Sequence, residues 1–196
     1  MRDPLYELLR HLTSPVVAIT TSAAGRRNGM IANSAQRASL VPSVPRVSFY
    51  ASKINYTHDL VYASGLFAMH LLRADQWELI WRLGLESGRD RDKLAGLEYR
   101  VGETGCPVLA GAVAVFECRV SNAMDAGAAT FFLGDVVAVT RGEPGPVMTS
   151  DYFRAHMPPD KRAIYDAKLD EAQRLLEALA RRVDPARVWP GPVVGP

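Results

Sequence analysis

Residues 15–72 alternate short apolar segments with clusters of turn residues, and this pattern constrains the fold more than any other part of the chain. The apolar segments are rich in Val, Ile, Thr and aromatic residues, which is typical of strands. They cover residues 15–21, 30–34 and 46–51. The cluster 22–29 between the first two contains Gly, Ser and Asn, and it predicts a turn. This half of the chain is therefore predicted to be mainly β.

Two longer valine-rich segments, 110–124 and 130–140, follow in the second half of the chain. They alternate partly between apolar and polar residues, as barrel strands do. The short stretch between them predicts an antiparallel hairpin. After them, Pro158-Pro159-Asp160 is typical of a helix start. We expect one domain over residues 1–196, with a C-terminal helical extension at about 159–184 that packs either on its own barrel or on a second subunit.

The composition indicates a compact domain and excludes several kinds of partner. With 196 residues, 48% hydrophobic and 22% charged, the chain can bury a sizeable core. A formal net charge of +2 is too small to indicate nucleic acid or an acidic membrane. No signal peptide or membrane-spanning run is expected, which predicts a cytoplasmic protein. The two cysteines and four histidines lack metal-binding spacing, so no metal site is expected.

The residues after the third predicted strand are the best candidate for a binding site. They read Ser52-Lys53-Ile54-Asn55-Tyr56-Thr57, and Thr57 is placed to cap a helix that runs to Gly65. A helix N-terminus beside a lysine and hydroxyl groups favours a phosphate, because its N–H groups and dipole attract anions. Each residue taken alone also fits an ordinary surface role, since lysines are usually solvated and a threonine caps a helix with or without a ligand.

The order of these pieces resembles the flavin reductase-like family, whose members bind FMN in a split β-barrel. The resemblance is carried by residues 28–34 (Asn-Gly-Met-Ile-Ala-Asn-Ser), by 38–42, by 52–60 with its Ser-Lys and Thr-His-Asp-Leu, and by 64–72. Weaker similarity continues to about Thr140. The resemblance implies an antiparallel Greek-key split β-barrel with peripheral helices, an FMN cofactor (or FAD), and a homodimer with the flavin near the subunit boundary.

The resemblance also implies a set of flavin-binding residues. The FMN phosphate is expected at the turn before the helix, the ring in a slot with small or apolar walls, and polar groups along the ring edge. The expected phosphate ligands are Ser52, Lys53, Asn55 and Thr57; the expected walls are Met30 and Ala32, with Phe49 or Tyr56; the expected ring contacts are Asn33, Ser34 and Ser39.

The function implied is that of a flavin reductase that transfers a hydride from NADH or NADPH to FMN, with an oxygenase as a possible partner protein. Many family members carry Gly-Asp-His near the nicotinamide, whereas this chain has Ala129 where the histidine would stand. His156 or an arginine is a candidate substitute, and the catalytic residues are not assigned. Two alternatives remain: an FMN-binding electron carrier that does not use NAD(P)H, and a non-catalytic barrel that acts as a binding module.

Overall fold

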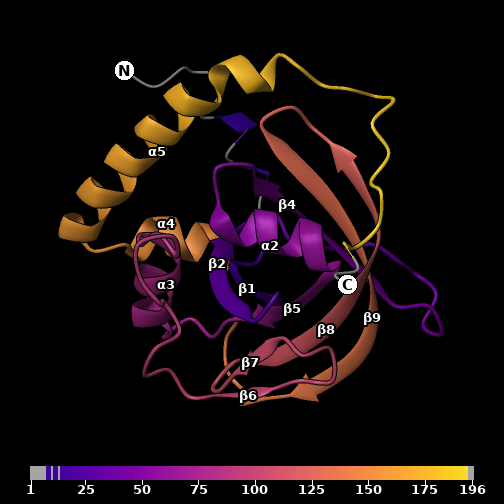
Figure 1. Cartoon of the computed structure of the whole chain (residues 1–196). Helices are drawn as coiled ribbons and strands as arrows, with labels where there is room; N and C mark the ends of the chain where they lie inside the picture. The colour runs from indigo at the N-terminus through magenta and orange to yellow at the C-terminus, as the bar shows by residue number, and fades with distance from the viewer. Residues whose placement is uncertain (1–7, 10, 13, 194–196) are drawn as a thin grey trace.

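The computed structural model describes residues 8, 9, 11, 12 and 14–193. Its main feature is a sheet in which all neighbouring strands are antiparallel, in the order β2-β1-β5-β8-β9-β4-β3 (Figure 1). The strands are β1 (Val17–Ala23), β2 (Arg26–Ala32), β3 (Gln36–Arg37), β4 (Arg46–Ser52), β5 (Leu66–Leu71), β8 (Ala114–Asp125) and β9 (Ala129–Arg141). β2 also contacts β4, so the sheet curls toward a barrel that stays open on one side.

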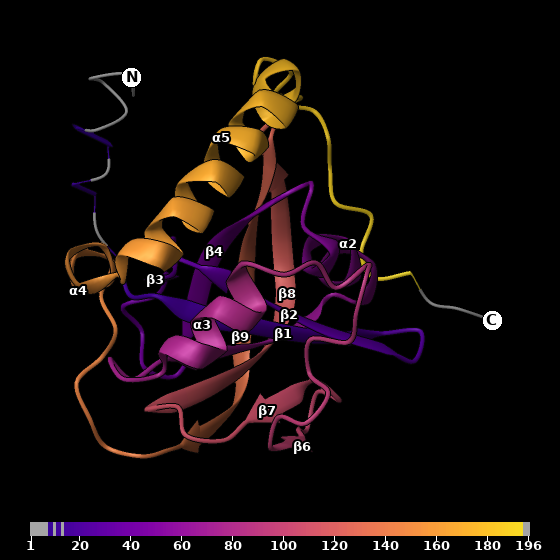
Figure 2. The ribbon, with the colours of Figure 1, turned by 90° about the vertical axis from the view of Figure 1, so that its left-hand side faces the viewer.

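In the described part of the chain, a second, two-stranded sheet and four helices surround the barrel. The small sheet is formed by β6 (Tyr99–Val101) and β7 (Pro107–Leu109). The helices are α2 (Tyr56–Ser64), α3 (Trp77–Gly84), α4 (Ser150–His156) and α5 (Pro159–Ala180). Figure 2 shows α3, α4 and α5 on one side of the sheet, with β6 and β7 at one end of the barrel. The predicted mainly β architecture and the hairpin between the two valine-rich segments are therefore confirmed.

The barrel interior is filled by aromatic and small aliphatic side chains. The rings of Phe49, Phe67 and Phe132 are completely buried, and Phe49 lies 5.0 Å from Phe67 and 5.3 Å from Phe132 between ring centroids. These residues come from β4, β5 and β9, so the cluster joins strands that are far apart in sequence. Burial of such large apolar surfaces is the main force that holds the barrel together.

The predicted turn over residues 22–29 is shorter in the structure. Ala24 and Gly25 make the turn with positive φ angles of 48° and 75°, while Asn28 and Gly29 lie inside β2. The reason is that both are needed in the strand: the Asn28 side chain is buried and donates to Thr57 Oγ1, and Gly29 packs closely on Leu83.

The C-terminal helix α5 begins at Pro159, as the sequence predicts, and ends at Ala180, a few residues before the predicted end. Its half-buried residues are Tyr165, Leu169, Ala172 and Leu176, with Lys161, Arg162 and Asp166 at its beginning. Figures 1 and 2 show α5 running from α4 past the sheet, with the following chain returning beside α2. No helix in the described part of the chain has both the length and the apolar character to cross a membrane.

The C-terminal end of α5 packs against the β8–β9 turn. A Cβ on Gly127 would lie 2.7 Å from the Leu179 carbonyl oxygen, so only glycine allows this close approach. Beyond the helix, Arg187 pairs with Asp125 at 3.1 Å, and the Trp189 indole N–H donates to the Tyr62 carbonyl at 3.1 Å. The helix is thus held at both ends of its span, since Tyr165 packs on Phe153 of α4.

Candidate flavin site

A groove runs along β2, which is an edge strand of the main sheet, beneath α3 and α5. It consists of two adjoining cavities of about 380 Å³ and 140 Å³. The residues common to both are Ile31, Gly84, Leu85 and Tyr165. An edge strand leaves one row of backbone N–H and C=O groups without a strand partner, so this edge groove offers backbone polar groups along an otherwise apolar slot.

The polar end of the edge groove lies at the first turn of α2. Asn55 occupies the N-cap position in an extended conformation, and no described side chain caps this helix. The expectation that Thr57 caps the helix is wrong, because Thr57 lies within the first turn and its Oγ1 accepts from Asn28 Nδ2 at 3.1 Å. The start of a helix without a side-chain cap keeps its positive dipole end available to an anion.

Arg89 brings a guanidinium to the same end. Its Nη1 donates to the Ile54 carbonyl at 2.8 Å, its Nη2 pairs with Asp59 at 2.7 Å, and its Cζ lies 5.3 Å from the centre of the Tyr56 ring. About half of the Arg89 side chain remains exposed. The arginine is therefore held against the loop before α2 while part of it still faces solvent and the groove.

The loop that carries Arg89 also closes the floor of the groove. A Cβ on Gly88 would lie 2.3 Å from Asn28 Oδ1, so the backbone of this loop rests directly on the buried asparagine. Lys93, from the same loop, is almost fully buried, and its Nζ donates to the Leu83 carbonyl at 2.8 Å. Burial lowers the pKa of Lys93 to about 8.

The sequence analysis did not identify Arg89 or Lys93 as site residues. Both stand in the run Gly-Arg-Asp-Arg-Asp-Lys of residues 88–93, whose alternating charges are typical of a solvated loop. Only the tertiary contact with the buried Asn28 brings this loop to the edge groove, and no sequence signal at residues 88–93 indicates that contact.

The other end of the edge groove is apolar. It is formed by Val16, Ile31, Ile80, Trp81, Leu85, Phe153 and Tyr165, with Asn33 as the polar exception. Trp81 and Phe153 are buried, with ring centroids 5.9 Å apart. This end suits a flat aromatic ring, since aromatic and aliphatic walls exclude water from such a ring.

The structure brings some of the predicted site residues together. Met30, Asn55 and Thr57 line the larger cavity of the edge groove, and Asn33 lines the smaller one. Ser52 lies at the turn that leads into α2, and its Oγ is buried with no hydrogen-bond partner among the described residues. An orphaned hydroxyl and a helix start without a side-chain cap fit a phosphate at this turn, so the residues present fit a flavin phosphate.

The remaining predicted residues lie elsewhere. Lys53 lines a separate cavity of about 240 Å³, where its Nζ contacts both carboxylate oxygens of Asp125 at 2.9 Å. Ala32 is buried in the barrel core, and the Ser34 hydroxyl is bonded to the backbone of Tyr50. Ser39 lines a different, apolar cavity on the open side of the barrel.

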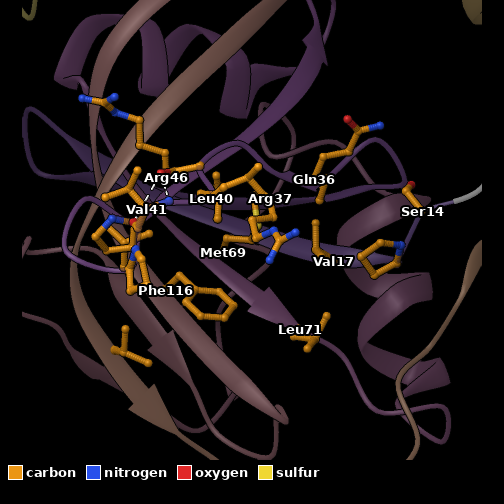
Figure 3. A pocket seen from close by; sticks show the side chains of 18 residues that line it. Ser14, Val17, Gln36, Arg37, Leu40, Val41, Arg46, Met69, Leu71 and Phe116 are labelled. Carbon is orange, nitrogen blue, oxygen red and sulfur yellow. Dashed lines mark hydrogen bonds between the residues drawn. The ribbon is translucent and has the colours of Figure 1, made fainter.

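That apolar cavity has a volume of about 810 Å³ and is shown in Figure 3. Met69, Leu71 and Phe116 form its floor, and Leu40 and Val41 lie on the loop beside it. The Leu40 side chain is 82% exposed and Val41 is 54% exposed. Ser39 accepts a hydrogen bond from the Val41 N–H at 3.1 Å, which keeps this loop turned.

Comparison with protein families identifies this architecture. A model of the flavin reductase like domain matches residues 9–158, which include the whole barrel and α4 but not α5. The chain therefore belongs to the flavin reductase-like family, and the predicted fold and family are confirmed.

Two curated relatives show the range of the family. The chain is 33% identical over 150 residues to the high molecular weight rubredoxin of Moorella thermoacetica, with 74% of this chain aligned. It spans 63% of that relative's length. It is also 33% identical over 137 residues to the ferric-chelate reductase (NAD(P)H) of Archaeoglobus fulgidus, which covers 68% of this chain and 80% of that protein.

Two solved structures share the fold. The NADH:FAD oxidoreductase of Streptomyces globisporus aligns with a TM-score of 0.68 and 28% identity, covering 76% of this chain and 91% of that one. Component B of a nitrilotriacetate monooxygenase from Mycobacterium thermoresistibile aligns with a TM-score of 0.65 and 27% identity, covering 74% and 79%. The open, curled sheet described above is thus the split barrel of this family.

Proposed function

We propose that this chain is an NAD(P)H-dependent flavin reductase that holds its flavin in the edge groove. The observation that carries the proposal is the pairing of two unlike ends: a helix start without a side-chain cap beside Arg89, and an apolar slot beside Trp81. The relatives support it, since two are described as reductases that use NAD(P)H or NADH.

Each end of the groove has a distinct task in this proposal. Arg89, Asn55 and the first turn of α2 bind the phosphate, and the orphaned Ser52 hydroxyl donates to it. Met30 and the walls near Ile31 orient the ring and exclude water. A bound flavin supplies the hydride acceptor, and the protein contributes position and electrostatics.

α5 covers the groove and belongs to this site in the proposal. Tyr165, Leu169 and Ala172 line the larger cavity from above, and Lys168 adds a cation at its margin. His156, the candidate substitute for the histidine absent at Ala129, lies on α4 with its ring stacked on Tyr152 at 4.0 Å. It does not line the edge groove, so we assign it no catalytic role.

Anaerobic mixing tests the reductase activity. We expect the absorbance of bound FMN or FAD to bleach rapidly when NADH or NADPH is added. A protein that binds flavin without bleaching would instead be the electron carrier considered above. A protein that binds no flavin would be a barrel with another role.

The two candidate phosphate cations can be separated by comparing FMN with riboflavin, which lacks the phosphate. Arg89→Ala should weaken FMN about tenfold or more and leave riboflavin nearly unchanged, because a charge-assisted hydrogen bond contributes roughly 1.5–3 kcal/mol. Lys53→Ala should do the same only if Lys53 leaves Asp125 when the flavin binds. Arg181→Ala is the matched control, since Arg181 directly after α5 is 77% exposed and pairs only with Glu177 among the described residues.

We further infer that the chain forms a homodimer through the apolar cavity, with a second copy as its occupant. Exposed apolar side chains gather there, and monomers rarely expose large contiguous apolar patches. An oxygenase partner that receives the reduced flavin is proposed because the related component B belongs to a monooxygenase. Transfer of reduced flavin to an added flavin-dependent oxygenase is the test.

A further inference from the structure

A series of three polar side chains connects the edge groove with the separate cavity that Lys53 lines. His58 lines that cavity, and Arg89 lines the groove. Between them lies Asp59, in the first turn of α2. Its Oδ1 lies 3.0 Å from His58 Nδ1, and its Oδ2 accepts from Arg89 Nη2 at 2.7 Å. One carboxylate is therefore shared by the histidine and by the arginine of the groove.

The His58 ring is held in one orientation that suits both of its charge states. The residue is buried, its Nε2 lies 2.8 Å from Thr130 Oγ1, and its ring stacks on Tyr62 with centroids 5.9 Å apart. Because the Asp59 carboxylate only accepts, Nδ1 of the neutral ring carries the hydrogen and Nε2 accepts from the Thr130 hydroxyl. A protonated ring donates to the same hydroxyl, which can also accept. Protonation therefore needs no movement of the ring.

Charged groups of both signs face this ring. On the side of the cavity, Lys53 and Arg187 pair with Asp125 at 2.9 Å and 3.1 Å. Burial is the largest cause that lowers the pKa of His58, and the two cations act in the same direction, whereas Asp59 favours the charged ring. His58 is therefore mainly neutral at pH 7 and gains its proton at lower pH.

The charge on His58 changes what Asp59 leaves to Arg89. Beside a neutral ring, the carboxylate compensates the charge of Arg89 alone. Beside a protonated ring, it pairs with two cations, so more of the guanidinium charge remains for an anion in the groove, and the carboxylate repels that anion less. Asp59 and Arg89 are each about half exposed, so solvent screens this effect and keeps it modest.

We propose that His58 is a positioning residue that acts through Asp59 on the charge of Arg89, so that a protonated His58 strengthens the binding of a flavin phosphate. The proposal rests on the flavin site proposed above. Linkage makes the effect reciprocal: bound FMN should raise the pKa of His58, whereas riboflavin, which has no phosphate, should leave it unchanged.

Binding measurements at several pH values test the proposal without catalysis. Dissociation constants for FMN and riboflavin are measured by calorimetry on the wild type, on His58→Gln, and on His156→Gln as the exposed-histidine control. The phosphate of FMN ionises in the same pH range, so each variant is compared with the wild type at the same pH. We expect His58→Gln to match the wild type at about pH 7.5 and to bind FMN about two- to threefold more weakly at about pH 5. Riboflavin affinity and the control should match the wild type throughout.

NMR of the imidazole signals gives a second measurement, and two variants locate the effect. The His58 signal, identified by its absence in His58→Gln, should titrate at higher pH with FMN than with riboflavin. Arg89→Ala should abolish this difference, because the guanidinium no longer holds the phosphate. Asp59→Asn should move the titration of His58 to lower pH in the free protein, since the carboxylate that favours the charged ring is gone, and should remove the pH dependence of FMN affinity from the same range.

Three results would overturn the proposal. The first is an FMN affinity ratio between wild type and His58→Gln that stays constant with pH. The second is a His58 titration that FMN does not shift. The third is a shift that survives Arg89→Ala, which would place the phosphate beside Lys53 on the other side of His58. Failure of the flavin site itself looks different, since Arg89→Ala would then weaken FMN and riboflavin alike, or the wild type would bind neither, and the proposal would fall with it.

Discussion

The edge groove and the apolar cavity are two openings in the same barrel that differ in size, cover and polarity. The groove is narrow, roofed by α5, and polar at one end. The apolar cavity is larger, and the loop beside it exposes Leu40 and Val41 to solvent (Figure 3). A small anionic ligand gains most from the first, because charged donors converge there. A protein surface gains most from the second, because burial of apolar area is the driving force.

The comparison shows that cavity size alone does not identify the functional site. The larger cavity has an apolar floor of Met69, Leu71 and Phe116, and of the two arginines that line it, Arg37 and Arg46, Arg46 pairs with Asp135 at 2.6 Å. The smaller groove contains the helix start and Arg89. In the proposed function, the charged and polar end of the groove binds the ligand, and the exposed apolar side chains of the larger cavity form the subunit interface.

The largest expected effect is on the proposed dimer. Leu40→Asp/Val41→Asp should give monomers if a second copy covers the apolar cavity, because each buried Leu or Val contributes roughly 1.5–3 kcal/mol and a buried carboxylate adds a further penalty. Sedimentation velocity measures the result. Val101→Asp on β6, where the side chain is 51% exposed outside the apolar cavity, is the control. A double variant that remains dimeric would show that the interface is elsewhere.

The second effect is a loss of stability at low pH in the barrel wall that the edge groove and the apolar cavity share. His70 on β5 is fully buried: its Nδ1 donates to the Ala18 carbonyl at 3.1 Å, and its Nε2 accepts the Leu109 N–H at 3.0 Å. The ring is therefore satisfied only when neutral. Burial, the largest cause, lowers the pKa of His70 to about 4.

The direction in which pH changes the free energy of unfolding follows from the linkage between proton binding and folding. Between about pH 6.5 and pH 4 the unfolded chain binds a proton that the folded chain does not, so the free energy of unfolding falls as the pH falls, by about 3 kcal/mol in all. Urea unfolding at several pH values measures this. His70→Gln should reduce the dependence over this range and leave the part due to His58, whose pKa is also lowered by burial, whereas His156→Gln, at an exposed position, should keep it. Loss of the proposed dimer should accompany acid unfolding, since Met69 and Leu71 flank His70 and line the apolar cavity.

The third effect is confined to the edge groove. Gly88→Ala places a Cβ where Asn28 Oδ1 now lies 2.3 Å away, so either the loop or the Asn28–Thr57 hydrogen bond must shift. We expect a loss of roughly 1–3 kcal/mol in stability and weaker FMN binding, with the dimer intact. Gly145→Ala is the control, because its nearest neighbour is the flexible Arg73 side chain. Unchanged FMN affinity in a destabilised Gly88 variant would separate this loop from the flavin.

The sequence predicts the architecture better than the site. Strand composition and turn residues give the β segments, and the predicted start of α5 at Pro159 is confirmed. Of the predicted site residues, Met30, Asn55 and Thr57 meet in one cavity, because they lie on the edge strand and the helix beside it. Lys53 does not join them, since the nearby Asp125 of β8 takes its ammonium group. A pairing of residues 72 positions apart leaves no local pattern.

The helix that covers the groove and the cations that line it could not be predicted either, because their contacts also join residues far apart in the sequence. Arg89 and Lys93 look like a solvated loop until Gly88 rests on Asn28. The face of α5 that carries Tyr165 and Leu169 is apolar by its spacing, but spacing does not say which surface the face covers. Local propensity determines which elements form, whereas the packing of distant elements determines which side chains meet.

The smallest expected effect concerns the β8–β9 turn, which lies between the groove's roof and the barrel. Ala129 begins β9 opposite Ser52 of β4, and Gly127 in the same turn touches the last carbonyls of α5. If a nicotinamide contact is absent at Ala129, Ala129→His should lower the KM for NADH or NADPH several-fold, since one added hydrogen bond contributes about 1 kcal/mol. FMN affinity should stay nearly constant, because the phosphate is bound at α2. Steady-state kinetics with both nucleotides and FMN titration measure the two quantities, and Ala128→His provides the same ring one residue earlier. A variant with altered FMN affinity and an unchanged KM would place the turn beside the flavin, and the edge groove would then extend beneath the end of α5.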